Sequence, residues 1–261
     1  MEIKSTKQET PEVKSFIFKD NLCSKARPGQ FVMVWIPDVD EIPMSLSGIG
    51  LGACSISVKK VGEATKALHQ RKNGDLIGIR GPFGHGFRLM GGKALVVGGG
   101  TGTTALMPLV ENLAGKNVKV AFLVGARTKN ELLFMDKIRG VLSKIEGRFE
   151  VTTEDGSYGF KGIVTDSAEK HLASEKFDMI YTCGPESMMH GMFLLASRFH
   201  TSLQASLERL MRCAIGICGT CVIGKYRVCS DGPVFTDEQL REVKEEFGHS
   251  VRTFDGRRIR L

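Results

Sequence analysis

Four cysteines near the end of the chain constrain its fold more than any other feature. They are Cys213, Cys218, Cys221 and Cys229. The first three follow the spacing C-x4-C-x2-C, which is typical of the thiolate ligands of a plant-type [2Fe–2S] cluster. Gly216 and Gly219 lie between them, and glycine allows a loop to curve tightly around such a compact group. The sequence therefore predicts a small [2Fe–2S] segment over residues 200–261, called here the iron–sulfur segment.

A structural zinc site is the alternative interpretation of these thiols, because zinc in proteins also takes four thiolate ligands. Zinc sites favour paired C-x2-C knuckles, so the longer first spacing favours iron. The visible absorption spectrum distinguishes the two, because a [2Fe–2S] cluster absorbs visible light and zinc does not.

The N-terminus and the composition indicate the cellular context. Residues 1–5 lack the apolar core of a secretory signal, and no stretch approaches the ~18 apolar residues that span a membrane. We therefore expect a cytoplasmic protein without a membrane partner, whose reduced cysteines serve metal or redox chemistry. The net charge of +7 is spread along the chain, and no reading element accompanies it, so no nucleic-acid partner is expected.

Residues 1–91 have the pattern of short β-strands. Residues 13–19 and 30–36 mix β-branched with aromatic side chains, and residues 54–61 alternate apolar with polar ones. Turn-forming pairs such as Pro28-Gly29 and Asn73-Gly74 separate the strands, and one helical stretch covers residues 64–70. This pattern predicts a small antiparallel β-barrel, called here the barrel domain.

Strands and helices alternate over residues 92–199, which indicates βαβ units and a parallel sheet. The predicted strands are residues 93–97, 118–124, 149–153 and 179–182, and the predicted helices are residues 105–113, 131–144 and 164–173. This part is called here the nucleotide domain. A charged helical stretch over residues 236–247 follows in the iron–sulfur segment, with Thr236 and Gln239 at the spacing of a capping box. The predicted fold is therefore multidomain, with β and α/β parts.

Glycines gather between the first strand and the first helix of the nucleotide domain. This glycine loop covers residues 98–105, and its candidate cofactor contacts are Gly98, Gly100, Gly102 and Thr103. Its G-x-G-x-x-A spacing is that of a dinucleotide loop, in which amides at a helix N-terminus bind a pyrophosphate. A plain glycine-rich turn is the alternative. No Asp or Glu ends the second strand, so the usual ribose contact is missing there.

The predicted strand over residues 179–182 runs into a second turn, Cys183-Gly184-Pro185, called here the CGP turn. Open parallel sheets bind ligands at the carboxyl ends of their strands, so Cys183 is a candidate for contact with a reacting group. Gly184 and Pro185 are candidate cofactor contacts. The residues alone support an alternative equally well, since cysteine is often a small buried side chain before a turn.

The order of these features resembles the ferredoxin–NADP reductase superfamily and, within it, the electron-transfer subunits of dihydroorotate dehydrogenase B. The matching segments are residues 27–31, 43–46, 60–65, 81–84, 98–102, 183–185, 208–229 and 231–235, which together span nearly the whole chain. Each segment has middling specificity, but their order along one chain is specific.

This resemblance implies FAD in the barrel domain. Family members hold the flavin with a strand of the type Arg-Pro-x-Ser, and the residues that match its latter half are Pro43, Met44, Ser45 and Leu46. Ile42 stands where the family has an arginine that pairs with the flavin pyrophosphate, so a charge-assisted bond is lost. The resemblance directs the pyrophosphate to the helix start between Gly62 and Thr65, with Lys59 or Lys60 as a source of charge.

The same resemblance implies NAD(H) in the nucleotide domain, with the nicotinamide near Cys183 and the pyrophosphate at Gly100 and Gly102. The ribose is then bound after the third strand, where Asp155 or Glu154 would accept from both hydroxyls and repel a 2′-phosphate. We therefore expect NAD rather than NADP, although Arg127 argues for NADP and a solvated turn is an equally supported alternative.

The function implied by the resemblance is electron transfer within a hetero-oligomer. A partner catalytic subunit with FMN would oxidise dihydroorotate, and electrons would pass through the [2Fe–2S] cluster and FAD to NAD+ in pyrimidine biosynthesis. The rival interpretation is an NAD(P)H-dependent reductase subunit that serves a ferredoxin-linked oxidoreductase or a hydrogenase. A more distant alternative is a regulator without enzymatic activity that binds zinc and a nucleotide.

Overall fold

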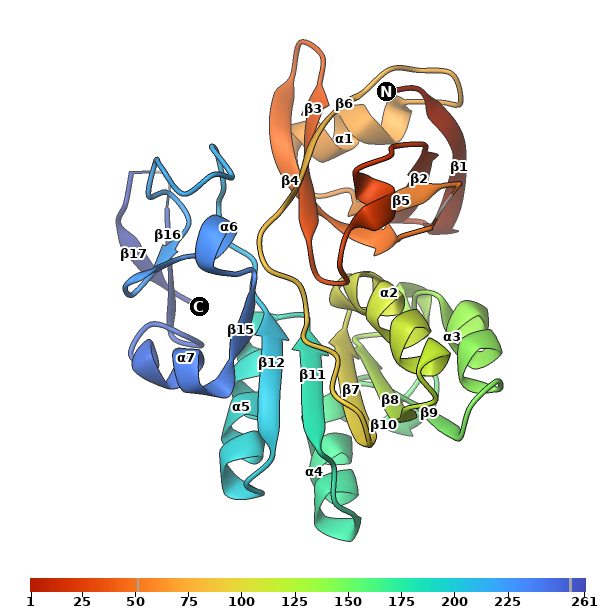
Figure 1. Ribbon diagram of the computed structural model, residues 1–261, viewed down its shortest axis with the longest axis vertical. Helices are drawn as coiled ribbons and strands as arrows, with labels where there is room; N and C mark the ends of the chain where they lie inside the picture. Colours follow the sequence, from red (N-terminus) through yellow and green to blue (C-terminus); the bar gives the residue numbers. More distant parts are fainter. Residues whose placement is uncertain (51, 254) are drawn as a thin grey trace.

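The computed structural model describes residues 1–50, 52–253 and 255–261. Figure 1 shows a β-rich part formed by the N-terminal residues, an α/β part below it, and the C-terminal residues beside both. Across the described residues, no helix is both long and apolar enough to cross a membrane.

The barrel domain is a six-stranded antiparallel sheet with the strand order β1-β2-β5-β4-β3-β6. Its strands are β1 (Ile3–Thr10), β2 (Val13–Phe18), β3 (Phe31–Ile36), β4 (Asp40–Gly48), β5 (Cys54–Lys59) and β6 (Gly78–Phe83). Helix α1 (Glu63–Gln70) and the short 3-10 turn η1 (Cys23–Lys25) complete the domain. The residues that lead into β6 contact β1 at the opposite edge of the sheet, where the Ile3 amide donates a hydrogen bond to the Asp75 carbonyl oxygen at 2.9 Å. The predicted antiparallel β-domain is confirmed.

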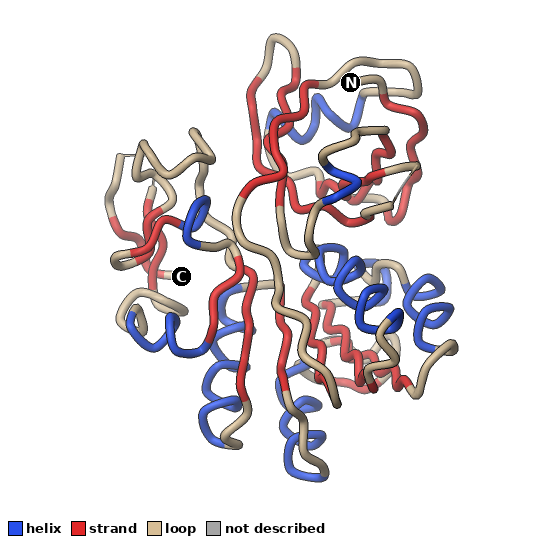
Figure 2. Tube along the Cα trace, viewed as in Figure 1, coloured by secondary structure: helices blue, strands red, loops and turns tan. Residues whose placement is uncertain are grey.

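The nucleotide domain is built on a seven-stranded sheet in the order β10-β9-β8-β7-β11-β12-β15, with helices on both faces (Figure 2). Its strands are β7 (Lys93–Gly99), β8 (Lys119–Ala126), β9 (Gly147–Thr153), β10 (Phe160–Lys161), β11 (Met179–Cys183), β12 (Ser202–Ser206) and β15 (Val234–Thr236). All neighbours pair in parallel except β12 and β15. Helices α2 (Gly102–Gly115) and α3 (Met135–Leu142) cover one face. Helices α4 (Val164–Ser174) and α5 (Glu186–Arg198) cover the other.

The iron–sulfur segment begins inside this sheet, because the segment supplies β12 and β15, the last two strands in the order of the sheet. The remaining elements are β13 (Val222–Ile223), β14 (Tyr226–Arg227), α6 (Val228–Asp231), α7 (Asp237–Glu242), β16 (Ser250–Arg252) and β17 (Arg258–Arg260). The sheet thus carries the nucleotide domain and the iron–sulfur segment on one continuous framework.

Two predicted helices are longer than the observed ones. The helix expected over residues 131–144 is broken, because Phe134 has a left-handed backbone with φ of +58° and separates the short 3-10 turn η2 (Lys129–Glu131) from α3. The helix expected over residues 236–247 ends at Glu242, after which Val243 and Phe247 turn into the core. The predicted capping box is confirmed, since Thr236 and Gln239 exchange backbone-to-side-chain hydrogen bonds.

One hydrophobic core joins all three parts of the chain. Phe31 and Met33 of β3 in the barrel domain lie in the same cluster as Cys221 and Phe235 of the iron–sulfur segment. Residues of helices α4 and α5 belong to this cluster too. Gly84 makes this approach possible, because a Cβ atom there would lie 2.6 Å from the Gly232 carbonyl oxygen. The barrel domain is therefore packed directly against the iron–sulfur segment.

We expect Phe31→Ala to lower the free energy of unfolding by about 3–5 kcal/mol, the usual cost of truncating a buried phenylalanine. Phe31 is 3% exposed and packs on Phe83 with ring centroids 5.9 Å apart. The matched control is Phe16→Ala, because Phe16 is equally buried but lies inside the barrel alone. Hydrogen exchange should accelerate at β15 in the Phe31 variant only. Equal acceleration in both variants would contradict the shared core.

Candidate functional site

The glycine loop and the CGP turn pack against each other at the carboxyl end of the sheet. Cys183, the last residue of β11, lies opposite Gly98 of β7 and Ser206 of β12. A Cβ atom on Gly102 would lie 2.4 Å from the carbonyl carbon and oxygen of Cys183. A Cβ atom on Gly184 would lie 2.9 Å from the Gly99 backbone. The structure therefore brings the two predicted nucleotide motifs together, backbone against backbone.

The glycine loop begins helix α2 as the sequence predicts. Gly102 is the first residue of the helix, and Gly100 has a left-handed backbone with φ of +51° and nothing within 4 Å of a Cβ position. The hydroxyl oxygens of Thr103 and Thr182 are buried, and neither has a hydrogen-bond partner among the residues that the structure describes. The open position beside Gly100 suits a phosphate group, which helix N-termini bind through their amides and dipole.

Cys183 is poised as a neutral thiol. Burial raises the pKa of the Cys183 thiol to about 12, and the nearby carboxylate of Glu208 adds to the rise. The thiol stays protonated at neutral pH, so Cys183 offers a small polarizable contact at the strand end rather than a nucleophile.

The four predicted cluster ligands lie in two pairs. The Cys218 amide donates to Cys213 Sγ at 3.5 Å, and the Cys229 amide donates to Cys221 Sγ at 3.4 Å. Cys221 and Cys229 are buried, whereas Cys218 is exposed. Over residues 1–50, 52–253 and 255–261, no three Cys, His, Asp or Glu side chains converge on one position for a single metal ion. Two thiol pairs are the donor set of a two-iron cluster, in which each iron takes two protein ligands.

The cluster loop, residues 213–221, is shaped to hold thiolates. Left-handed backbone at Ala214, Gly216 and Gly219, with φ of 61°, 78° and 72°, curves the loop. Burial acts to raise the pKa of Cys213, but amides of Cys218, Ile215 and Ile217 outweigh it and lower that pKa to about 6. The loop therefore stabilises the thiolate of Cys213, the form in which cysteine binds iron.

The flavin strand predicted from the resemblance is the centre of β4. Ser45 and Pro43 pair with Phe31 and Met33 of β3. Leu46 and Met44 turn toward the interior of the barrel. Helix α2 of the nucleotide domain lies against β4, so this strand faces the nucleotide domain.

At the start of α1, the Thr65 hydroxyl accepts hydrogen bonds from the amides of Val61 and Gly62, both at 2.9 Å. It donates a hydrogen bond to the Gly62 carbonyl oxygen. These hydrogen bonds fix the turn at Gly62, where a Cβ atom would have no described neighbour within 4 Å.

The predicted ribose contact lies in the turn after β9. Asp155 is exposed and accepts hydrogen bonds from the amide and hydroxyl of Ser157 at 2.9 and 2.7 Å, which lower the pKa of its carboxyl. Arg127 is held by the Glu131 carboxylate in a close ion pair. The charge of Arg127 is therefore already balanced within the chain.

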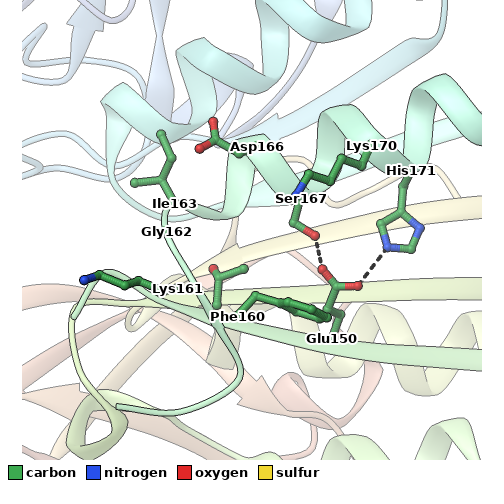
Figure 3. Close-up of a pocket in the computed structure, with 10 residues that line it drawn as sticks. Glu150, Phe160, Lys161, Gly162, Ile163, Asp166, Ser167, Lys170 and His171 are labelled. Carbon is green, nitrogen blue, oxygen red and sulfur yellow. Dashed lines mark hydrogen bonds and ion pairs between the residues drawn. The ribbon is translucent and has the colours of Figure 1, made fainter. Parts of the chain in front are cut away.

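A polar cleft of about 170 Å³ lies between the edge strands and α4, apart from the predicted site residues. Figure 3 shows Ser167 and His171 of α4 directed at the Glu150 carboxylate, with His171 Nε2 at 3.2 Å. Thr152 lines this cleft, and its hydroxyl has no hydrogen-bond partner in the described part of the chain. No sequence signal singled out this cleft.

Sequence reasoning also missed a buried ion pair beside the CGP turn. The two terminal guanidinium nitrogens of Arg209 donate to the Glu186 carboxylate, and the two side chains are 3% and 8% exposed. The amide of Gly248 donates to the same Glu186 carboxylate at 2.9 Å. The spacing of Pro185-Glu186 and Glu208-Arg209 carries no motif, so only the fold shows that these residues meet.

Two family models match the chain. The iron–sulfur cluster binding domain of dihydroorotate dehydrogenase B matches residues 208–241, and the oxidoreductase NAD-binding domain matches residues 96–192. Among solved structures, an NADH-dependent reduced ferredoxin–NADP oxidoreductase studied for flavin-based electron bifurcation is 31% identical, with a TM-score of 0.83, covering 94% of this chain and 92% of that one. A ferredoxin reductase of carbazole 1,9a-dioxygenase shares the fold at 21% identity and a TM-score of 0.66, covering 76% of this chain and 64% of that one.

Fold and site together define a nicotinamide-linked oxidoreductase that carries an iron–sulfur segment. A relative from Methanocaldococcus jannaschii is 42% identical over 259 residues, covering 98% of this chain and 96% of its own length. One from Thermoplasma volcanium is 39% identical, covering 100% and 98%. Both are named "Probable dihydroorotate dehydrogenase B (NAD(+)), electron transfer subunit". The chain belongs to this family of electron transfer subunits, which confirms the resemblance seen in its motifs.

We expect Gly102→Ala to weaken NAD(H) binding more than tenfold, because the added Cβ meets only backbone atoms of the CGP turn and one motif must move. Gly115→Ala is the matched control at the other end of α2, where nothing lies within 4 Å of the Cβ position. Titration calorimetry measures the affinity, and thermal unfolding reports stability. Unchanged affinity in the Gly102 variant would show that the contact between the motifs does not form the site.

Proposed function

We propose that the chain is the electron-transfer subunit of an NAD-dependent dihydroorotate dehydrogenase, with FAD, a [2Fe–2S] cluster and NAD as its cofactors. The observation that carries the proposal is the single core in which the barrel strand β3, the sheet of the nucleotide domain and the cluster cysteines meet. Such packing fixes the distances between the cofactor sites, which electron transfer requires.

When bound, the cofactors would supply the redox chemistry, namely hydride exchange between nicotinamide and flavin and single-electron transfer between flavin and cluster. The chain positions them. Gly100 and Gly102 would hold the NAD pyrophosphate at the start of α2, with Gly98 and Thr103 behind them. Cys183, Gly184 and Pro185 would line the nicotinamide. In this assignment the cluster ligands are Cys213, Cys218, Cys221 and Cys229.

In the barrel domain, the flavin contacts that we propose are Pro43, Met44, Ser45, Leu46, Gly62 and Thr65. Two observations support this assignment. The strand β4 faces α2 across the domain boundary, and the open Gly62 lies in a turn fixed by Thr65. Ile42 carries no charge, so it cannot make the charge-assisted bond that the family's arginine makes to the flavin pyrophosphate.

We further propose that the nucleotide is NAD rather than NADP. Asp155 presents a carboxylate in the turn after the third strand, where it would bond the ribose hydroxyls and repel a 2′-phosphate. Arg127, the one residue that favoured NADP, is paired with Glu131.

The partner that we propose is the FMN-containing subunit that oxidises dihydroorotate. The exposed side of the cluster loop supports a docking face there, because Ile215 and Ile217 are 55% and 78% exposed beside the exposed Cys218. Apolar side chains in such positions typically mark a protein interface. We also propose a cytoplasmic location, which suits a chain whose seven cysteines, all within the described residues, form no disulfide.

A second candidate function is that of a reductase subunit for another electron carrier. It is favoured by the 31% identity to the NADH-dependent reduced ferredoxin–NADP oxidoreductase, which covers nearly the whole chain. The cofactor sites are the same in both candidates, so the partner decides between them.

Purification with co-eluting protein tests the proposal. We expect visible absorption from flavin and iron–sulfur, a co-purified FMN protein, and dihydroorotate oxidation with NAD+ at least tenfold faster than with NADP+. Asp155→Asn should reduce the preference for NAD+ over NADP+, because the carboxylate that repels the 2′-phosphate is lost. A colourless, zinc-containing protein would indicate the regulator. A coloured complex without dihydroorotate oxidation would indicate the second candidate.

Ile217→Lys should weaken association with the partner at least tenfold, which is about 1.4 kcal/mol of binding free energy. The reason is that a charge would replace an apolar side chain that the proposed interface buries. The matched control is Leu194→Lys, since Leu194 is also exposed (54%) but lies on α5. Affinity is measured by surface plasmon resonance, with the absorption spectrum as a check on the cluster. Equal weakening by both substitutions would place the interface elsewhere.

A further inference from the structure

Arg80 crosses from the barrel domain to the cluster loop. It lies on β6, and its guanidinium donates to the backbone oxygen of Cys213 at 3.2 Å. The same group forms a fork with the Glu41 carboxylate of β4, at 2.9 and 2.8 Å. No sequence motif predicted this bridge, and none of the functions assigned above uses it.

The bridge joins two parts of the chain between which electrons must pass. Arg80 donates to the residue that begins the cluster loop, and it leaves from the strand next to Phe31 and Met33, which carry the shared core. A fixed guanidinium therefore orients the first ligand of the cluster from outside the iron–sulfur segment.

The charges of this pair also act on the cluster. Reduction adds one negative charge to the cluster, and its potential depends on nearby charges and hydrogen bonds. The cation of Arg80 favours the reduced form, whereas the anion of Glu41 favours the oxidised form. Both side chains are partly exposed, at 44% and 30%, so the interaction is moderated by solvent but not removed.

A second arginine binds the loop in the same way from within the iron–sulfur segment. Arg227 donates to the Gly216 backbone oxygen at 3.0 Å and pairs with Asp231 at 3.6 Å. Two carbonyls of the cluster loop thus accept from arginines, and each arginine is balanced by a carboxylate. Of these two arginines, Arg80 is the one that comes from the barrel domain.

We propose that Arg80 positions the Cys213 end of the cluster loop and raises the reduction potential of the cluster, and that Glu41 limits the rise. This inference rests on the proposed [2Fe–2S] cluster but not on the identity of the partner. A role confined to packing would change both variants of the pair in the same direction, whereas the electrostatic role changes them in opposite directions.

The test is a redox titration of the purified holoprotein, monitored by electron paramagnetic resonance. Arg80→Gln should lower the ratio of reduced to oxidised cluster at a fixed potential by about threefold to tenfold, about 30–60 mV for a one-electron couple. Glu41→Gln should raise the same ratio, because the cation is left unbalanced. Arg80→Lys keeps the charge and should restore most of the potential.

The matched control is the exposed pair of Arg198 and Glu169 between α5 and α4, where Arg198→Gln and Glu169→Gln should leave the potential unchanged. Shifts of the same sign in the Arg80 and Glu41 variants, or no shift in either, would overturn the proposal. Iron content and thermal unfolding show that the variants are folded and loaded. A wild-type protein without a cluster signal overturns this inference together with the proposed function. A normal cluster signal without dihydroorotate oxidation overturns only the proposed function.

Discussion

The architecture depends on one shared hydrophobic core. Phe31 and Met33 of the barrel domain pack in one cluster with Phe235, Cys221 and residues of helices α4 and α5. This contact joins the barrel domain directly to the iron–sulfur segment. Because protein interiors are close-packed, a core of this kind holds its parts at fixed separations. Oxidoreductases with several cofactors need such fixed separations, so the core is as much a part of the site as the cysteines.

Much of the nucleotide domain was predictable from local pattern. The apolar run before the glycine loop, the loop itself and the cysteine at the end of β11 each lie where the sequence placed them, because strand–turn–helix units are encoded within a few residues. The contact between Gly102 and Cys183 was not predictable, since it depends on the neighbouring positions of β7 and β11 in the sheet. Sequence periodicity also missed the break at Phe134, where a left-handed residue interrupts an otherwise helical pattern.

The polar contacts that join distant segments were the least accessible to sequence reasoning. Glu186 and Arg209 form a buried pair that ties the CGP turn to the start of the iron–sulfur segment. Breaking one side of such a pair typically costs about 3–5 kcal/mol, because the remaining charge is left buried alone. The residues themselves look ordinary in sequence. What distinguishes them is burial, and burial follows from the whole fold.

The sheet has a consequence for how the protein is made. A chain emerging from the ribosome completes the barrel strands by Phe83, and domains generally fold as units during synthesis. The seven-stranded sheet, however, lacks its edge strand until Thr236 has been added, long after the glycine loop has emerged. Until then, β12 is an unpaired edge strand of the nascent nucleotide domain, and unpaired edge strands are prone to pair with other chains. The proposed cluster ligands Cys213 to Cys229 emerge in the same interval, so the ligands and the edge strand become available at the same late stage.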